Sequence, residues 1–142
     1  MKKKILIFSS RGGGGHTSAA HAITTYLADF DTEIIDLGDL FRSIDPFYWL
    51  SFKRITGQDF YNILLQQNRK KSVNKLYRLG CLLTRTLKHP IRLVLQRCIA
   101  QKSPDMIISV IPMINGALAD ICNELSIPYL LVPTDLELHA FM

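Results

Sequence analysis

A histidine that directly follows four consecutive glycines is the residue of this sequence best suited to chemistry. It is His16, in the stretch ILIFSSRGGGGHTSAAHA at residues 5–22. A glycine-rich turn between a strand and a helix exposes backbone N–H groups at the positive end of the helix, where an anion or a close ligand fits. The same dipole disfavours an imidazolium. We therefore expect a neutral ring that takes a proton from an attacking hydroxyl, although helix capping or substrate contact fits the same spacing.

The glycine loop matches neither of the two common nucleotide-binding motifs. A P-loop requires a lysine after its last glycine, and none follows here. The pattern GxGxxG fails as well, because its last position would fall on Thr17 or on Ser18. Asp36 is only a weak match for the acidic residue expected about 20 positions later. The sequence thus predicts a cradle for a phosphate or polar ligand that belongs to neither standard type.

The elements around this loop predict an α/β fold with a parallel sheet. A short apolar run at 3–9 is typical of a strand buried on both faces, and a helix is expected from Thr17 to about Ala28. With a strand at 32–37 they make one right-handed βαβ unit. The later pattern predicts a strand at 105–111, a helix at 114–125 and a strand at 128–133.

Two finer expectations concern the helices. In the first helix, a rotation of about 100° per residue places the apolar side chains on one face. This face comprises Ala19, Ala22, Ile23, Tyr26 and Leu27. The long middle segment, about 39–102, should hold several helices, with breaks at Gly57 and Pro90.

Composition fits one domain over residues 1–142, with a basic helical insertion at about 39–102. The net charge is +5, yet no acidic residue stands between Asp59 and Asp105, where ten basic residues occur. Such a segment is suited to an anionic partner.

The three cysteines are widely spaced, and we expect reduced thiols, no metal site and a cytoplasmic protein.

Both ends of the sequence resemble one enzyme family. The stretch GGGGHTSAAHAI resembles the GGGH-x-x-A-A-x-A-[IL] opening of the monogalactosyldiacylglycerol synthases and of the processive diacylglycerol glucosyltransferases. The strand PDMIISVIP is similar to their D-x-I-[IV]-S-x-x-P, and PYLLVPTDLELHAFM to their strand followed by T-D-x-x-x-H. The match spans Lys3 to Phe141, and it is specific at the ends only.

This resemblance implies the N-terminal, Rossmann-like half of a GT-B glycosyltransferase. Such an enzyme transfers a hexose from a UDP-sugar to a lipid acceptor such as diacylglycerol, with inversion. The acceptor domain would be the one present, and the C-terminal donor domain, which binds the UDP-sugar, would be absent. We therefore expect this chain alone to be inactive, with its donor domain in the same chain or in a second one.

Carried over by position, His16 corresponds to the candidate base for the acceptor hydroxyl. The acceptor loop and the second motif comprise Gly13, Gly14, Gly15, Thr17, Asp135 and His139. The resemblance leaves the roles of Asp135 and His139 open. Ile111 stands where the family often has a histidine or an aromatic residue before the proline, which loosens the assignment to one sugar or lipid.

The basic segment predicts a helix that rests on an anionic leaflet, although a solvated face on an ordinary core helix would carry the same charges. Wound as a helix over 71–88, it gathers cations in one arc around a leucine; this set is Lys71, Lys75, Arg78, Leu82, Arg85 and Lys88. Trp49, in the aromatic stretch 45–54, is expected at headgroup level, although aromatic core packing fits that stretch equally well. The protein would thus be peripheral on the cytoplasmic face of the membrane.

Two other functions remain open from the sequence. One is a non-catalytic module that binds anionic membranes, and the other is one subunit of a two-chain glycosyltransferase. No recognised nucleic-acid motif accompanies the basic segment, so we expect no nucleic-acid partner.

Overall fold

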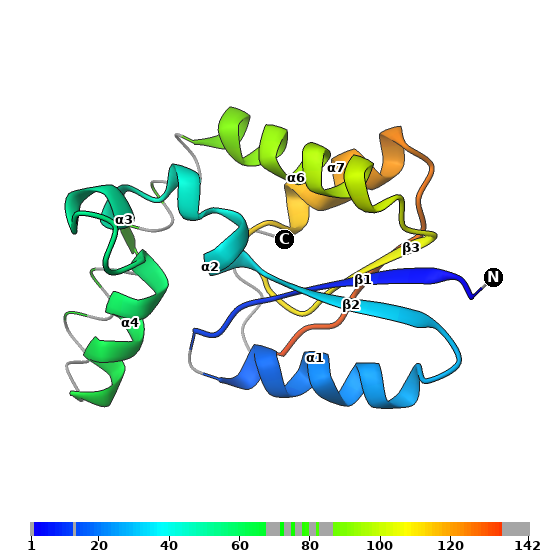
Figure 1. Cartoon of the computed structure of the whole chain (residues 1–142), viewed down its shortest axis with the longest axis horizontal. Helices are drawn as coiled ribbons and strands as arrows, with labels where there is room; N and C mark the ends of the chain where they lie inside the picture. The colour runs from blue at the N-terminus through cyan, green and yellow to red at the C-terminus, as the bar shows by residue number, and fades with distance from the viewer. Residues whose placement is uncertain are drawn as a thin grey trace.

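A four-stranded sheet forms the centre of the computed structural model, which describes residues 2–12, 14–67, 72, 75, 78, 79, 82 and 87–134 (Figure 1). The elements follow in the order β1 (Lys4–Ser9), α1 (Gly15–Tyr26), β2 (Asp31–Asp36), α2 (Leu37–Leu40), the 3₁₀ helix η1 (Arg42–Ile44), α3 (Pro46–Leu50), α4 (Gly57–Gln66), α6 (Lys88–Lys102), β3 (Met106–Ser109), α7 (Asn115–Glu124) and β4 (Tyr129–Leu131).

The sheet is parallel throughout, with the strand order β2-β1-β3-β4. β1 lies between β2 and β3, so that Ile7 pairs with Ile34 on one side and with Ile108 on the other. All of β1 after Lys4 is buried, as its apolar run predicts. The predicted α/β fold with a Rossmann-like parallel sheet is confirmed.

Helices of the described ranges cover both faces of the sheet, one helix on the first face and two on the other (Figure 1). α1 packs on one face, and α6 and α7 pack on the other (Figure 1). Alternate residues of β1 serve the two layers: Ile7 contacts the cluster of Ala20, and Phe8 contacts the cluster of Leu95 and Leu118. Each of these five side chains is 0% exposed, so the two layers form a continuous core around β1.

The buried face of α1 differs from the predicted one. Ala20 is fully buried, and Ile23 and Leu27 pack beside it, whereas Ala22 is exposed and Tyr26 is 90% exposed. The expected apolar face was therefore centred wrongly. Ala20 sets the centre because a small side chain permits the closest approach of helix to sheet.

The middle of the chain contains several helices, as expected, and Gly57 stands at a boundary because it is the first residue of α4. The predicted break at Pro90 lies slightly earlier in the chain, because Leu87 is in a turn and α6 begins at Lys88. Pro90 is the third residue of α6, within the first turn, where a backbone N–H has no partner inside the helix to lose.

α3 and α4 form a helical hairpin beyond the carboxyl ends of the strands (Figure 1). The carboxylate of Asp45 caps α3 by accepting from the N–H of Phe47 at 2.8 Å, and it also accepts from the N–H of Gly57 at 2.7 Å. The rings of Phe47 and Phe60 stack at 5.7 Å. One carboxylate and one aromatic pair thus fix the two helices against each other.

Two cations of the basic segment pair with acids elsewhere in the fold. Arg92 on α6 bonds to Glu124 on α7, and Lys102 bonds to Glu33 on β2. The hydrogen bond from Lys102 lowers the pKa of Glu33. These two cations therefore hold α6 in place instead of facing an external anion. Among the described residues no helix is long and apolar enough to cross a bilayer.

Candidate functional site

The carboxyl ends of β1 and β3 meet at the point where the strand order reverses. The chain leaves β1 toward β2 on one side, and later enters β3 on the other side. In open parallel sheets, ligands bind outside the carboxyl ends of the strands at such a switch point. The glycine loop follows β1 directly, so this edge of the sheet is the candidate site.

The described glycines of the loop have different reasons to be glycine. Gly14 is the N-cap of α1 and has φ +80°, a left-handed conformation that a residue with a Cβ adopts at a cost. A Cβ on Gly12 would lie 3.3 Å from Ser10 Oγ and 3.8 Å from the ring of Tyr61 on α4. A Cβ on Gly15 would meet nothing within 4 Å. Gly12 thus permits contact with α4, and Gly14 and Gly15 face open space.

His16 is the second residue of α1 and is half-buried. Its Nδ1 lies 2.7 Å from the hydroxyl oxygen of Thr134, three residues beyond β4. The Thr134 hydroxyl in turn donates to the carbonyl of Val110, directly after β3, at 3.0 Å. Three chain segments that leave the same edge of the sheet therefore meet at this ring.

Thr17, predicted to be in the acceptor loop, makes a local structural contact. Its hydroxyl donates to the carbonyl of Ser10 at 3.2 Å, and its side chain is half-buried. This bond ties the first turn of α1 to the end of β1. Thr17 therefore supports the loop from the inside.

Arg11 is held by two carboxylates at the start of the loop. Its N–H donates to Asp36 Oδ2 at 3.0 Å, and its guanidinium donates to Asp36 Oδ1 at 3.1 Å and to Asp39 Oδ2 at 2.8 Å. The hydrogen bond to Asp36 and the negative charge of Asp36 raise the pKa of the Arg11 guanidinium above its ordinary value. The amide of Asn62 on α4 donates to the Arg11 carbonyl at 3.1 Å. The loop is therefore fastened to β2 and to α4.

Asp36 occupies the end of β2, where a dinucleotide-binding fold places its ribose-binding acid. Here both carboxylate oxygens of Asp36 accept hydrogen bonds from Arg11. Oδ1 also accepts from the N–H of Asp39 at 3.1 Å, and through this bond Asp36 caps the N-terminus of α2. An acid with these internal partners is not offered to a ribose. This geometry agrees with the failed nucleotide motif.

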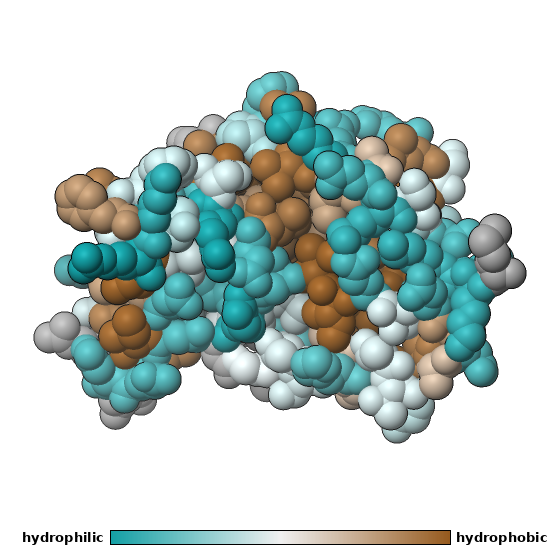
Figure 2. Space-filling view, viewed as in Figure 1, coloured by the Kyte–Doolittle hydropathy of each residue, from teal (hydrophilic) through white to brown (hydrophobic). Residues whose placement is uncertain are grey.

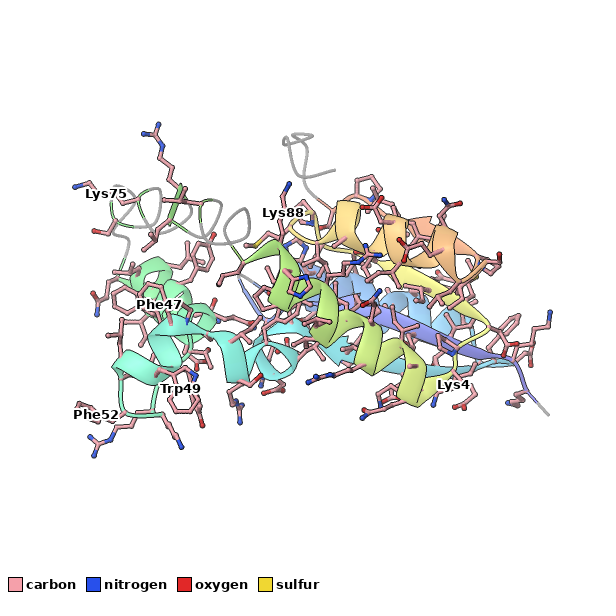
Figure 3. All side chains as sticks on the ribbon, turned by 90° about the horizontal axis from the view of Figure 1, so that it is seen from above. Lys4, Phe47, Trp49, Phe52, Lys75 and Lys88 are labelled. Atoms are coloured by element: carbon pink, nitrogen blue, oxygen red, sulfur yellow. The ribbon has the colours of Figure 1, made fainter. Side chains whose placement is uncertain are left out.

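The structure describes only part of the predicted site. Gly13, Lys71, Arg85, Asp135 and His139 lie outside the described residues. Of the predicted lipid-contacting set, Lys75, Arg78, Leu82 and Lys88 are all exposed. In Figure 3, Lys75 lies toward the end of the molecule formed by α3 and α4, and Lys88 lies nearer its middle.

Trp49 belongs to a group of exposed apolar side chains on α3, α4 and the turn between them, which we call the α3–α4 apolar surface. Trp49 is 55% exposed and Phe52 is 89% exposed, and both lie at the end of the molecule remote from Lys4 (Figure 3). The surface comprises Trp49, Leu50, Phe52, Ile55, Phe60, Ile63 and Leu65. Figure 2 shows hydrophobic and strongly hydrophilic side chains side by side over this end.

Cations accompany the aromatic rings of this surface. The ammonium of Lys53 lies 4.9 Å from the centre of the Trp49 ring, and the Arg42 guanidinium lies 5.7 Å from that of Tyr48. The indole N–H of Trp49 donates to the Ser43 carbonyl at 2.9 Å, which fixes the ring at the surface. In the aromatic stretch, Phe47 is half-buried and stacks on Phe60, while Trp49 and Phe52 are exposed.

Sequence reasoning missed three residues that organise this edge, Arg11, Asn62 and Thr134, and it considered Asp36 only as a weak ribose-binding acid and not as the partner of Arg11. The hydrogen-bond partners of Arg11 lie 25 to 51 residues from it in the sequence. His16 and Thr134 are 118 residues apart in the sequence. Only Thr134 carried a signal, since it stands in the stretch TDLELH that resembles the family's second motif.

Within the described ranges, no group of three or more His, Cys, Asp or Glu side chains is arranged to hold a metal ion. Comparisons with known protein families, with curated proteins and with solved structures find no match for this chain.

Proposed function

We propose that this chain is the acceptor-binding domain of a membrane-associated glycosyltransferase, with His16 as the base for the acceptor hydroxyl. The observation that carries the proposal is the position of His16 in the first turn of α1, directly after the glycine loop, at the switch point of a parallel sheet. An imidazole there can take a proton from a hydroxyl bound outside the strand ends. The likeness of both chain ends to the diacylglycerol glycosyltransferases supports the same role.

The α3–α4 apolar surface supports a lipid as the acceptor. Exposed aromatic side chains with adjacent cations favour the headgroup level of a membrane. Contacts join α4 to the glycine loop, through Asn62 to the Arg11 carbonyl and through the close approach of Tyr61 to Gly12. If these helices rest on a bilayer, the loop lies close to the surface where a diacylglycerol hydroxyl is found.

The test of the enzyme is transfer of label from a UDP-sugar to lipid. The chain is expressed together with any coding sequence that follows Met142 in its gene, and alternatively mixed with a separately encoded donor domain. UDP-[¹⁴C]glucose or UDP-[¹⁴C]galactose is supplied with vesicles of diacylglycerol and phosphatidylglycerol. We expect labelled lipid, and we expect His16→Ala to reduce its rate by about 10²–10⁴-fold.

The matched control is His21→Ala, which removes an exposed imidazole from the same helix. It should leave the transfer rate unchanged. If neither sugar labels the lipid in either arrangement, the enzyme proposal is wrong. If His16→Ala transfers at the parent rate, the enzyme stands and the base assignment does not.

A second candidate function is a non-catalytic module that binds anionic membranes, and the α3–α4 apolar surface favours it. Co-sedimentation of the 142-residue chain with phosphatidylglycerol or phosphatidylcholine vesicles tests the membrane contact. We expect binding to the anionic vesicles only, weakened by salt, by Trp49→Ala and by Lys75→Glu with Arg78→Glu. Tyr26→Ala is the control, because it removes a 90% exposed aromatic ring from α1. Equal binding to both vesicle types would contradict the electrostatic part of the proposal.

Membrane binding by itself does not distinguish the two functions. The module predicts binding without transfer in the labelling assay, and the glycosyltransferase predicts both. The His16→Ala variant should bind vesicles like the parent chain under either function, because His16 is not part of the α3–α4 apolar surface.

A further inference from the structure

The hydroxyl of Thr134 has one proton and two neighbours. Its oxygen lies 3.0 Å from the Val110 carbonyl and 2.7 Å from His16 Nδ1. A carbonyl oxygen only accepts hydrogen bonds, so the bond to Val110 uses the hydroxyl proton. The remaining lone pairs of the hydroxyl can then only accept, and the 2.7 Å contact requires a proton on Nδ1 of the imidazole.

We infer that Thr134 is a positioning residue that holds the neutral His16 ring in its Nδ1–H form, so that Nε2 is the atom that receives a proton. The inference rests on the proposed role of His16 as a base. A neutral imidazole has one donor and one acceptor nitrogen, and the bond at one nitrogen decides the state of the other. Thr134 therefore determines which atom of the ring is basic.

The backbone holds Thr134 in place on the side of β3. The N–H of Val132 donates to the Ser109 carbonyl at 2.9 Å, which continues the pairing of β4 with β3. The N–H of Val110 donates to the Phe8 carbonyl at 3.1 Å, which continues the pairing of β3 with β1. The acceptor for the His16 N–H is thus carried by the segment that follows β4, which is joined to the β3 side by the bonds of Val132 and of the Thr134 hydroxyl.

The proton balance of the transfer follows from this arrangement. The O–H bond of the acceptor breaks, and its proton passes to Nε2 of His16. The acceptor oxygen forms a bond to the anomeric carbon of the sugar, and the bond from that carbon to the nucleoside diphosphate breaks with its electron pair. The ring becomes an imidazolium whose Nδ1–H still donates to Thr134, because a hydroxyl accepts from either form. The bond therefore persists through the step.

The ring nitrogens report the tautomer directly, without any activity. The chain is labelled with ¹⁵N, and proton–nitrogen correlations of its imidazole rings are recorded at pH 8. The His16 signals are identified by their loss in His16→Gln. We expect a protonated Nδ1 and an unprotonated Nε2, which is the reverse of the form that an unrestrained neutral imidazole prefers in water. A predominantly Nε2–H ring in the unaltered chain would overturn the inference.

Two substitutions separate the hydroxyl from the shape of the side chain. Thr134→Val removes the acceptor and keeps the size, and we expect the His16 ring to revert to the Nε2–H form. Thr134→Ser keeps the hydroxyl and should keep the Nδ1–H form. A Thr134→Val ring that stays Nδ1–H would also overturn the inference. If that variant does not fold, the spectra of the unaltered chain and of Thr134→Ser still decide.

The lipid-labelling assay separates this inference from the proposed function. We expect Thr134→Val to lower kcat by about tenfold or more, within the contribution of a positioned base, and Thr134→Ser to restore it. An Nδ1–H ring in a chain that never labels lipid leaves the tautomer assignment standing and rejects the enzyme. Active enzyme with an Nε2–H ring rejects the role of Thr134 and keeps the enzyme.

Discussion

Arg11 and Asp36 are joined by two hydrogen bonds, one from the backbone and one from the side chain. The Arg11 N–H donates to Asp36 Oδ2 at 3.0 Å, and its guanidinium donates to Oδ1 at 3.1 Å. The first bond fixes the path of the chain as it leaves β1, and the second neutralises the carboxylate. Since Arg11 is followed directly by the glycines, this pair fixes where the loop begins.

Asp36→Ala should loosen the glycine loop. The substitution removes the acceptor of the Arg11 N–H together with the N-cap of α2, so the free energy of unfolding should fall by about 1 kcal/mol, a typical value for a lost cap. Amide hydrogen exchange measured by mass spectrometry should become faster in the peptide that contains Arg11. Asp39→Ala is the control, because it removes a guanidinium partner and leaves the bond to the Arg11 N–H in place. Equal exchange in the two variants would contradict the assignment.

Gly14→Ala should destabilise the protein, whereas Gly15→Ala should not. Gly14 has φ +80°, and an L-residue in the left-handed region costs about 1–2 kcal/mol. Gly15 is the first residue of α1, and a Cβ there meets nothing within 4 Å. Urea denaturation of the two variants compares the same chemical change at neighbouring positions. A loss of stability in Gly15→Ala that equals the loss in Gly14→Ala would show that the backbone angle is not the cause.

The strand, the loop and the first helix were predictable because their signals are local. The apolar run that becomes β1 and the glycines after it each determine structure within a few residues. The buried face of α1 was not predictable to the same degree. Tyr26 lies about 90° around the helix from the stripe of Ala20, Ile23 and Leu27, and only the sheet beneath decides where the stripe is centred.

The contacts that organise the candidate site are not visible in the sequence, because they join distant segments. Nothing in the spacing of His16 and Thr134 indicates that β4 lies beside β3 and brings their side chains to 2.7 Å. Pro90 located a helix boundary only to within a few residues. A proline is accepted in the first turn of a helix, where its missing N–H has no partner inside the helix, so Pro90 lies just inside α6 and not before it.

Cys98 and Cys122 should resist modification in the folded protein. Burial raises the pKa of both thiols, that of Cys122 to about 11, so at pH 8 little of either thiol is the reactive thiolate. In a Cys81→Ser variant, the thiol reagent DTNB should react slowly in buffer and completely in urea. Two thiols that react at once without denaturant would contradict the buried positions of these side chains.

Low pH should destabilise the N-terminus of α4, because the Asp59 carboxylate that is hydrogen-bonded to Thr56 loses its charge. The hydroxyl and the backbone N–H of Thr56 both donate to this carboxylate, at 2.7 Å and 3.0 Å, and they lower its pKa. A lowered pKa stabilises the folded state at pH values above the ordinary value of about 4, and this contribution is lost as the pH falls through the folded-state pKa. Asp59→Asn should therefore lower the free energy of unfolding at pH 7, and lower it less at pH 3, where the carboxylate of the unaltered chain also loses its charge. Urea denaturation at both pH values measures this, with the exposed Asp120→Asn as a charge-matched control.

Phe52→Gly should make the protein more stable and, if the proposed membrane contact is made, weaken its binding to vesicles. Phe52 and Lys53 have φ values of +52° and +65°, although neither is a glycine, and the Phe52 ring is 89% exposed. Relief of one left-handed residue is worth about 1 kcal/mol. The folded protein thus retains a strained turn that displays a large apolar ring, which is understandable when the ring has a partner outside the chain.

The two effects of this substitution are measured separately, by urea denaturation and by co-sedimentation with phosphatidylglycerol vesicles. Phe52→Ala is the matched control, because it removes the same ring but keeps a Cβ in the left-handed conformation. It should weaken vesicle binding as much as Phe52→Gly without the gain in stability. If both variants bind vesicles like the parent chain, the Phe52 ring does not enter the membrane, and the strain at this turn has another cause.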